Sequence, residues 1–276
     1  MPALFEGMVD DAAVFPPGNA PLDRAVVDHH RHREAWYAGL VGPLVVPASA
    51  AADLIALAGA EPVATVIVGD TGVDRVAEAA TSLRDAGIPV RQVEVAVAKR
   101  GEDPQPGLAQ LMEVAAGLAG VGVYAEIPLT WGVLGALDTI ADARRGGASV
   151  SAKFRTGGLA AELFPSPSDL AAVIVACHER GVPFKLTAGL HRAVRHNNPE
   201  TGFTHHGFLN ILAACLMAAE GGSPAIVGER LAASDPVPLI EAVRAARDEP
   251  RPLWTGFGSC DISEPVDDLV AFGLLG

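Results

Sequence analysis

The strongest constraint on the fold of this chain is an alternation between short apolar segments and longer amphipathic ones. The short segments are rich in β-branched residues and the longer ones have helical spacing, so the alternation predicts parallel strands joined by helices. Strands are expected at 42–46, 62–68, 90–98, 122–127, 148–154, 183–188, 225–228 and 252–257. Helices are expected at 22–38, 50–59, 72–86, 107–119, 131–145, 168–180, 205–220, 235–247 and 265–272.

Eight such units predict a (β/α)₈ barrel, the TIM barrel, for which roughly 250 residues are typical. The 276 residues therefore fit a single domain. The helix at 22–38 precedes the first expected strand, so it is interpreted as an extra N-terminal helix and residues 1–38 as an arm. Segment 10–18 then lies either at the barrel mouth or outside the barrel. If the short segment 225–228 is not a strand, the alternative fold is an open doubly wound sheet.

Composition and charge narrow the possible partners. Half of the residues are hydrophobic, which provides a large core, and the net charge is −13. Such an acidic surface repels nucleic acids and anionic membranes, so neither is expected as a partner. The three widely spaced cysteines indicate no disulfide framework, and the N-terminal residues do not have the pattern of a signal peptide. We expect a cytoplasmic protein with a small anionic substrate as its partner, and both a monomer and a homo-oligomer remain open.

Lysine is rare in this chain, and two of the three lysines lie within apolar strands. Lys153 and Lys185 alternate with apolar residues, so their side chains are expected to point into the barrel. The same alternation points further polar side chains inward: Glu94, Glu126, Arg155 and Thr187. Unpaired buried charges cost several kcal/mol each. We therefore expect an ion-paired site at the C-terminal ends of the strands; the alternative is a structural ion-pair lattice without chemistry.

Glycines follow two of the expected strands. Gly157 and Gly158 come directly after the strand that carries Arg155, and Gly256, Gly258 and Ser259 follow the last strand. Backbone N–H groups beside glycines can approach an anion closely, and the loops after the last two strands often bind phosphate in such barrels. These five residues are expected to hold the anionic part of a substrate. The alternative is that the glycines serve tight turns.

A long loop at 189–210 contains half of the eight histidines. Loops between a strand and a helix usually span about two to six residues, and longer ones are commonly functional. His191 lies nearest the strand end and is the expected acid or base. No cofactor is expected; the alternative is a divalent metal held by His191, His205 and His206 with Glu126. No HxH or HExxH pattern accompanies them, and His205 and His206 could simply open the next helix.

Four sequence motifs carry a resemblance to known proteins. They begin at Phe15 (FPP), Lys153 (KFRTGG), Phe184 (FKLTAGLH) and His206 (HGFLN). Along most of its length the chain resembles a group of uncharacterised bacterial proteins without an established activity. Separately, a lysine on the sixth expected strand resembles the Schiff-base position of class I aldolases with the (β/α)₈ fold. Only Lys185 corresponds to that position.

Together these features predict an enzyme that acts on a small anionic carbonyl compound bearing a carboxylate or phosphate. Lys185 is expected to form a Schiff base. Lys153 and Arg155 are expected to lower the pKa of Lys185 and to hold the anion. Glu126 or His191 would move protons in carbon–carbon cleavage or formation, or in a dehydration. The reaction is therefore lyase-like and similar to that of aldolases. The alternatives are a metal-dependent hydrolase or isomerase that uses the histidine loop, and a non-catalytic barrel that binds a phosphorylated ligand.

Overall fold

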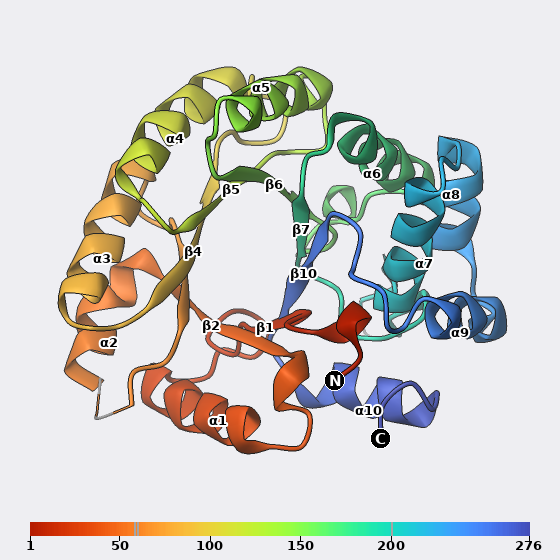
Figure 1. The fold of residues 1–276 in the computed structure, drawn as a ribbon, viewed down its shortest axis with the longest axis horizontal. Helices are drawn as coiled ribbons and strands as arrows, with labels where there is room; N and C mark the ends of the chain where they lie inside the picture. The colour runs from red at the N-terminus through yellow and green to blue at the C-terminus, as the bar shows by residue number, and fades with distance from the viewer. Residues whose placement is uncertain (58, 60, 200) are drawn as a thin grey trace.

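The computed structural model describes residues 1–57, 59, 61–199 and 201–276 and contains a closed barrel of eight parallel strands (Figure 1). Around the barrel the strands follow the order β1-β10-β7-β6-β5-β4-β3-β2. Their bounds are β1 Val9–Asp11, β2 Val41–Pro47, β3 Thr65–Val68, β4 Val90–Ala96, β5 Gly122–Glu126, β6 Val150–Arg155, β7 Phe184–Thr187 and β10 Trp254–Ser259. The expected (β/α)₈ fold is confirmed, and closure of the sheet excludes the open alternative.

The helices form a ring outside the barrel (Figure 1). They are α1 Leu22–Glu34, α2 Ala51–Leu57, α3 Val73–Asp85, α4 Gln105–Gly117, α5 Val133–Arg145, α6 Pro167–Arg180, α7 Phe208–Ala219, α8 Pro224–Ala232, α9 Pro236–Ala245 and α10 Ser263–Ala271. Each overlaps an expected helix except α8, and residue 58 of the helix expected at 50–59 lies outside the described residues. Within the described residues, no helix has the length and apolar character needed to cross a membrane.

The N-terminal segment supplies a strand that the sequence pattern did not predict. Val9 pairs with Phe257 of β10 on one side and with Val41 of β2 on the other, so β1 closes the barrel. Consequently α1 is the first ordinary barrel helix, and the expected extra helix and N-terminal arm are wrong. The strand is short and two of its three residues are aspartates, which are depleted in strands, so its pattern is weak.

Segment 12–20 connects the C-terminal end of β1 to α1 and therefore lies at the barrel mouth. The backbone N–H of Ala12 donates to the Ser259 carbonyl, 2.7 Å away, which anchors the segment beside the end of β10. Of the two placements considered from the sequence, the mouth is confirmed. The FPP motif that begins at Phe15 thus belongs to the loop after β1, at the C-terminal face of the barrel.

The expected strand at 225–228 is wrong, because these residues lie inside α8. Val227 and Leu231 are spaced four residues apart and both are fully buried, as on one face of a helix. Ser223 before Pro224 also marks a helix start, since proline is favoured in the first turn. The sequence pattern thus misses β1 and places a strand in α8. The predicted total of eight strands is confirmed, but each strand from β2 to β7 stands one place later in the barrel than predicted. Lys153 lies on the sixth barrel strand and Lys185 on the seventh.

The hydrophobic core lies between the outer faces of the strands and the helices. On β10, Trp254 and Phe257 stack with ring centroids 5.8 Å apart, and Phe257 stacks in turn on Phe208 of α7. On neighbouring strands, Phe154 and Phe184 are fully buried with centroids 6.2 Å apart. These apolar residues alternate with the polar ones that point inward, so the strands present an apolar face to the helices and a polar face to the barrel interior.

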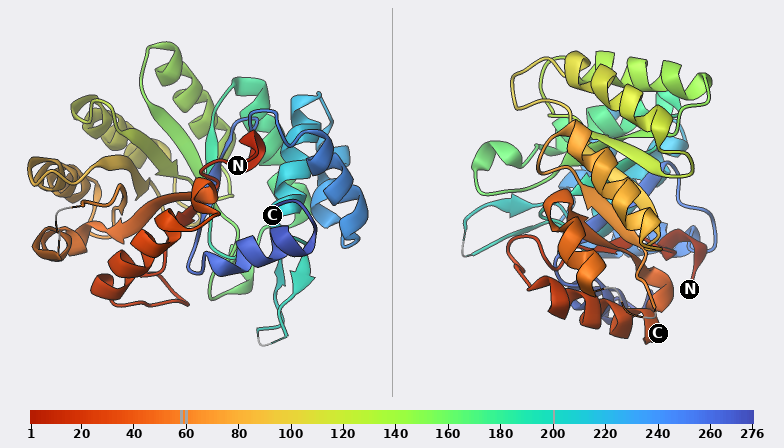
Figure 2. Two further views of the ribbon diagram at one scale, coloured as in Figure 1. Left: turned by 60° about the horizontal axis from the view of Figure 1, so that its bottom comes forward. Right: turned by 90° about the vertical axis from the view of Figure 1, so that its left-hand side faces the viewer.

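A small antiparallel hairpin projects from the body of the molecule (Figure 2). It consists of β8 His196–Asn197 and β9 Thr204–His205, within the long loop between β7 and α7. Phe203 and His205 each lie with their ring centroids 4.9 Å from that of Phe164, which belongs to the loop after β6. The hairpin therefore supports one wall of the barrel mouth.

Candidate active site

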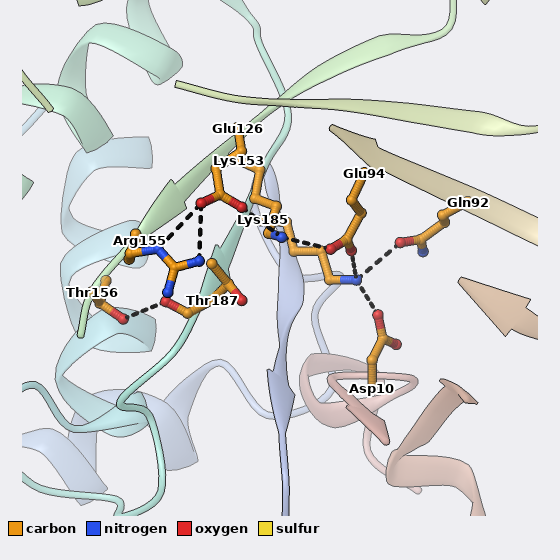
Figure 3. A network of polar contacts seen from close by, with 9 residues as sticks. All are labelled: Asp10, Gln92, Glu94, Glu126, Lys153, Arg155, Thr156, Lys185 and Thr187. Carbon is orange, nitrogen blue, oxygen red and sulfur yellow. Dashed lines mark hydrogen bonds and ion pairs between the residues drawn. The ribbon is translucent and has the colours of Figure 1, made fainter. Parts of the chain in front are cut away.

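A lysine with three acceptors lies at the inner end of the polar network in the barrel (Figure 3). The Lys185 ammonium donates to carboxylate oxygens of Asp10 and Glu94 in short contacts, and to Gln92 Oε1 at 3.0 Å. An ammonium group has three protons, so each has an acceptor. Lys185 is therefore held as a fully paired cation.

Glu94 joins this lysine to a second one nearer the mouth. Its other oxygen, Oε2, lies 2.7 Å from Lys153 Nζ, which is also 2.8 Å from Glu126 Oε2. Glu126 Oε1 in turn accepts a hydrogen bond from Arg155 Nε at 3.2 Å and lies 3.2 Å from Arg155 Nη2 in an ion pair. The six groups alternate in sign along one chain: Asp10, Lys185, Glu94, Lys153, Glu126 and Arg155. We call this chain the charge relay.

The strand register brings these side chains together. Lys153 is the register partner of Glu126 on β5 and of Lys185 on β7, so three charged residues occupy one level of the barrel. Asp10 fits because the facing residue on β2 is Gly42: a Cβ atom there would overlap Asp10 Oδ1. Thus a missing side chain on β2 makes room for the inner end of the charge relay.

The pKa values follow from this pairing. Burial alone would raise the pKa of Glu94, but Lys153 and Lys185 outweigh burial and bring it down to about 2. Burial alone would lower the pKa of Lys185, but Asp10 and Glu94 outweigh it and raise the pKa above its usual value. Lys153 likewise has a raised pKa, because Glu94 and Glu126 outweigh its burial. The expectation that neighbouring cations lower the pKa of Lys185 is therefore wrong: its contacts are carboxylates.

The pKa values of the two other carboxylates in the charge relay, Asp10 and Glu126, shift in opposite directions. Burial raises the pKa of Asp10 more than contact with Lys185 lowers it. For Glu126, the attraction of Lys153 and Arg155 exceeds the effect of burial, so its pKa is lowered. Glu126 is therefore a carboxylate at neutral pH, held between two cations.

Exposure increases along the charge relay toward the mouth. The Lys153 side chain is 4% exposed, that of Glu126 17% and that of Arg155 43%. Glu126 and Arg155 line a cavity of about 320 Å³ that we call the mouth cavity. Its other walls come from the loops after β4, β5 and β6 and from the first turn of α6: Ala98, Arg100, Ile127, Pro128, Leu129, Glu162, Leu163, Phe164, Pro165 and Asp169. The charge relay is thus open to a cavity at its outer end.

The residues expected to bind the substrate near β6 are arranged differently from the prediction. The Thr187 carbonyl accepts from the backbone N–H and the hydroxyl of Thr156, which ties the ends of β6 and β7. A Cβ atom on Gly157 would lie 3.0 Å from the Cα of Gly189, and one on Gly158 would overlap Leu163. These glycines thus permit close packing between loops.

The residues expected in the loop after the last strand lie within β10 itself. Gly256 has φ +141°, and a Cβ atom there would lie 2.5 Å from the Met8 carbonyl oxygen, so it allows β1 and β10 to approach. Gly258 belongs to the same strand. The hydroxyl of buried Ser259 donates to the Asp261 carbonyl at 2.8 Å, which forms a turn at the strand end. The loop after the last strand, in which the sequence predicts phosphate binding, therefore begins only after Ser259.

The three histidines of the alternative metal site turn toward different partners. His191 Nδ1 lies 2.9 Å from Glu264 Oε2 of α10. His205 Nδ1 lies 3.1 Å from the Gly189 carbonyl, and His206 Nε2 lies 2.9 Å from the Pro165 carbonyl. Among the described residues, no group of three or more histidine, cysteine, aspartate or glutamate side chains is arranged to hold a metal ion. The structure does not bring the proposed ligand set together.

The sequence predicts five of the six residues of the charge relay; it misses Asp10, and it also misses Arg100 in the lining of the mouth cavity. Asp10 lies on a strand of three residues without an alternating pattern, so the sequence contains no signal for it. Arg100 was missed because it lies in a loop, where side-chain direction has no simple periodicity. The residues that alternation pointed inward, Lys153 and Lys185 among them, do converge in the barrel interior.

Comparison of the chain with models of known protein families and with curated proteins gives no match. The protein is a (β/α)₈ barrel, a fold that commonly carries enzymes, with their active sites at the C-terminal ends of the strands. Its charge relay reaches the surface at that end. With no matching family, the function is inferred from the geometry of this site.

Proposed function

We propose that this protein is an enzyme that acts on a small carbonyl compound with a carboxylate or phosphate group, and that it moves a proton at the carbon beside the carbonyl. One observation carries the proposal: Glu126 joins a buried ammonium, Lys153, to a half-exposed guanidinium, Arg155, and lines the mouth cavity. A base and an anion-binding group thus line one small cavity, and an acid, Lys153, lies directly behind the base. Buried charges of this kind at a barrel mouth commonly mark function.

Each of the three groups has a role in such a reaction. Arg155 binds the anionic group of the substrate, since a guanidinium matches carboxylate and phosphate oxygens with paired N–H donors. Glu126 takes the proton from the carbon next to the carbonyl. The electron pair of that C–H bond moves to the carbonyl oxygen, where the Lys153 ammonium donates a hydrogen bond or its proton. The product is an enol or enolate. When the next carbon carries a hydroxyl group, the electron pair re-forms the carbonyl and a C=C bond, the C–O bond breaks, and Glu126 returns its proton so that the hydroxyl leaves as water, which is a lyase reaction.

Substrate binding also activates the base. In the free protein Arg155 helps to lower the pKa of Glu126. An anion on Arg155 competes for its N–H groups and offsets its charge, so the pKa of Glu126 rises toward the range useful for a general base. Catalysis is in this way coupled to the presence of an anionic group on the substrate.

Exchange of substrate protons with solvent tests this proposal directly. The protein is incubated in D₂O with a panel of small 2-oxo acids and sugar phosphates, and deuterium beside the carbonyl is measured by NMR. Exchange above the uncatalysed rate for at least one compound supports the proposal. Binding of panel members without exchange or turnover favours a barrel that only binds its ligand.

A covalent Schiff-base route is the second candidate, because two lysines lie side by side in the barrel. An imine requires a neutral amine, whereas Lys185 is held protonated by Asp10 and Glu94. Lys153 contacts Glu126, which opens onto the mouth cavity, so it is the more accessible of the two. Borohydride reduction with the same panel, followed by peptide mapping, separates the routes: an adduct on Lys185 or Lys153 supports the covalent one, and its absence the non-covalent one.

A further inference from the structure

The mouth cavity is lined by both charged and apolar side chains. Arg155 and Glu126 form one wall, while the loops after β5 and β6 contribute Leu129, Leu163 and Phe164. The ring of Phe164 is fixed by Phe203 and His205 of the hairpin, as described above. A volume of about 320 Å³ is at the lower end of the range for small-molecule sites. The cavity therefore fits a small ligand with one charged end and an apolar body.

Two arginines provide cationic groups for the charged end. Arg155 donates from Nε to one oxygen of Glu126 and holds Nη2 near the same oxygen, while its Nη1 has no partner among the described residues. Arg100 also lines the cavity, and within the described part of the chain its guanidinium makes no hydrogen bond or ion pair. The loop that carries it is tied down by Trp131, whose indole N–H donates to the Gly101 carbonyl at 3.0 Å. Both guanidinium groups keep donors for a ligand.

The groups that usually bind phosphate are already occupied in this part of the molecule. The N-terminus of α6 borders the cavity, but Asp169 fills it: its carboxylate accepts from the Ser166 N–H at 3.2 Å, and the Ser166 hydroxyl accepts from the Asp169 N–H. The glycines after β6 do not line the cavity, and a Cβ atom on Gly158 would overlap Leu163. A phosphate would thus meet neither a free helix N-terminus nor an open glycine loop. A carboxylate needs only the planar guanidinium groups.

We infer that the substrate is a carboxylate with an apolar body, of the class of 2-oxo acids with a branched aliphatic or aromatic side chain, rather than a sugar phosphate. The inference rests on the proposed function and narrows its substrate class. Arg155 and Arg100 hold the carboxylate, and Leu129, Leu163 and Phe164 contact the side chain. Each methylene buried against these residues is expected to tighten binding about fourfold.

Titration calorimetry on the full chain tests the inference with a matched series of ligands. The probes are pyruvate, 2-oxobutanoate, 4-methyl-2-oxopentanoate and phenylpyruvate, with dihydroxyacetone phosphate as the phosphate. We expect the dissociation constant to fall along the acid series and the phosphate to bind at least tenfold more weakly than the largest acids. A dissociation constant that is independent of side-chain size, or tighter binding of the phosphate, overturns the inference.

Three variants show whether binding involves the mouth cavity. Phe164→Ala is expected to flatten the dependence on side-chain size while pyruvate binding changes less than threefold. Arg100→Gln weakens all four acids together. Leu159→Ala is the control, because that side chain lies in the same loop as Phe164 but is 95% exposed and outside the cavity lining. Circular dichroism melting checks that each variant is folded. If Phe164→Ala does not fold, Leu163→Ala tests the same wall of the cavity.

The outcomes separate this inference from the proposed function. If a phosphate binds best and exchanges its protons with solvent, the substrate class is wrong while the proposed function stands. If apolar acids bind as described but none exchanges protons, the substrate class stands while the proposed function fails. If no compound binds, both are wrong.

Discussion

Lys153 and Lys185 share a single buried carboxylate: each ammonium contacts a different oxygen of Glu94. This places two positive charges within one barrel interior, balanced by carboxylates on three other strands. Removing any one partner from such a network leaves a buried charge without compensation, which is far more costly than removing the network as a whole. The stability of the barrel and the chemistry of its mouth are therefore linked through Glu94.

Replacing Lys185 with methionine should destabilise the protein strongly. Asp10 loses its cation and Glu94 loses one of two, so the free energy of unfolding is expected to fall by about 3–5 kcal/mol. Urea denaturation measures it. Adding Asp10→Asn to Lys185→Met should recover part of the loss, because the unpaired carboxylate is then gone. Lys99→Met, at an exposed loop position, serves as control and should change stability by less than about 0.5 kcal/mol. Equal stability of Lys185→Met and the wild type would show that Asp10 and Glu94 do not need the Lys185 ammonium as a partner.

Stability in acid should depend on Glu94. Its pKa is lowered from 4.5 to about 2 in the folded protein, so its contribution to stability is fully present above about pH 4.5 and is lost as pH falls toward 2. The contribution is on the order of 3 kcal/mol. In Glu94→Gln the stability at neutral pH is lower, and the decline between pH 4.5 and 2 is shallower. Unfolding free energies measured across this pH range check the slope, and parallel curves for both proteins would contradict the assignment.

A methyl group at Gly42 should disturb the inner end of the relay. The added Cβ atom would overlap the Asp10 carboxylate, which then has to leave Lys185. Gly42→Ala is expected to lower the free energy of unfolding by at least about 2 kcal/mol. Gly135→Ala in α5 is the matched control: its new Cβ atom has only an ordinary contact with Gln105, and alanine favours a helix by about 0.5–1 kcal/mol over glycine. Thermal denaturation of both variants should give shifts of opposite sign.

Removing the guanidinium at the mouth should move the pH dependence of catalysis. Arg155 contributes to the low pKa of Glu126, so Arg155→Gln raises that pKa. The acid limb of the kcat/KM profile, which reports ionisation of the base in the free enzyme, should therefore shift to higher pH while KM increases. Arg100→Gln is the comparison: it should increase KM without moving the acid limb. An unmoved limb in Arg155→Gln would mean that another group is the base.

Much of the fold and of the site followed from the sequence because alternation within strands is a local signal. Lys153 and Lys185 were placed correctly because each stands between apolar neighbours that pack against helices. The pKa values of these lysines did not follow from the sequence, because they depend on partners far away in the chain. Asp10, for example, is separated from Lys185 by 175 residues. The short strand β1 has too little pattern to stand out, while 225–228 shows that a short apolar run can equally belong to a helix.

Hydrogen–deuterium exchange of a 2-oxo acid with solvent, compared between the wild type and Glu126→Gln, tests the central claim most directly. The wild type is expected to exchange the protons beside the carbonyl, and Glu126→Gln to lose this activity by about 10²–10⁴-fold while still binding the acid. Glu113→Gln, an exposed carboxylate on α4, serves as control and should exchange at the wild-type rate. Undiminished exchange in Glu126→Gln, or no exchange of any acid that binds the wild type, would contradict the role assigned to the charge relay.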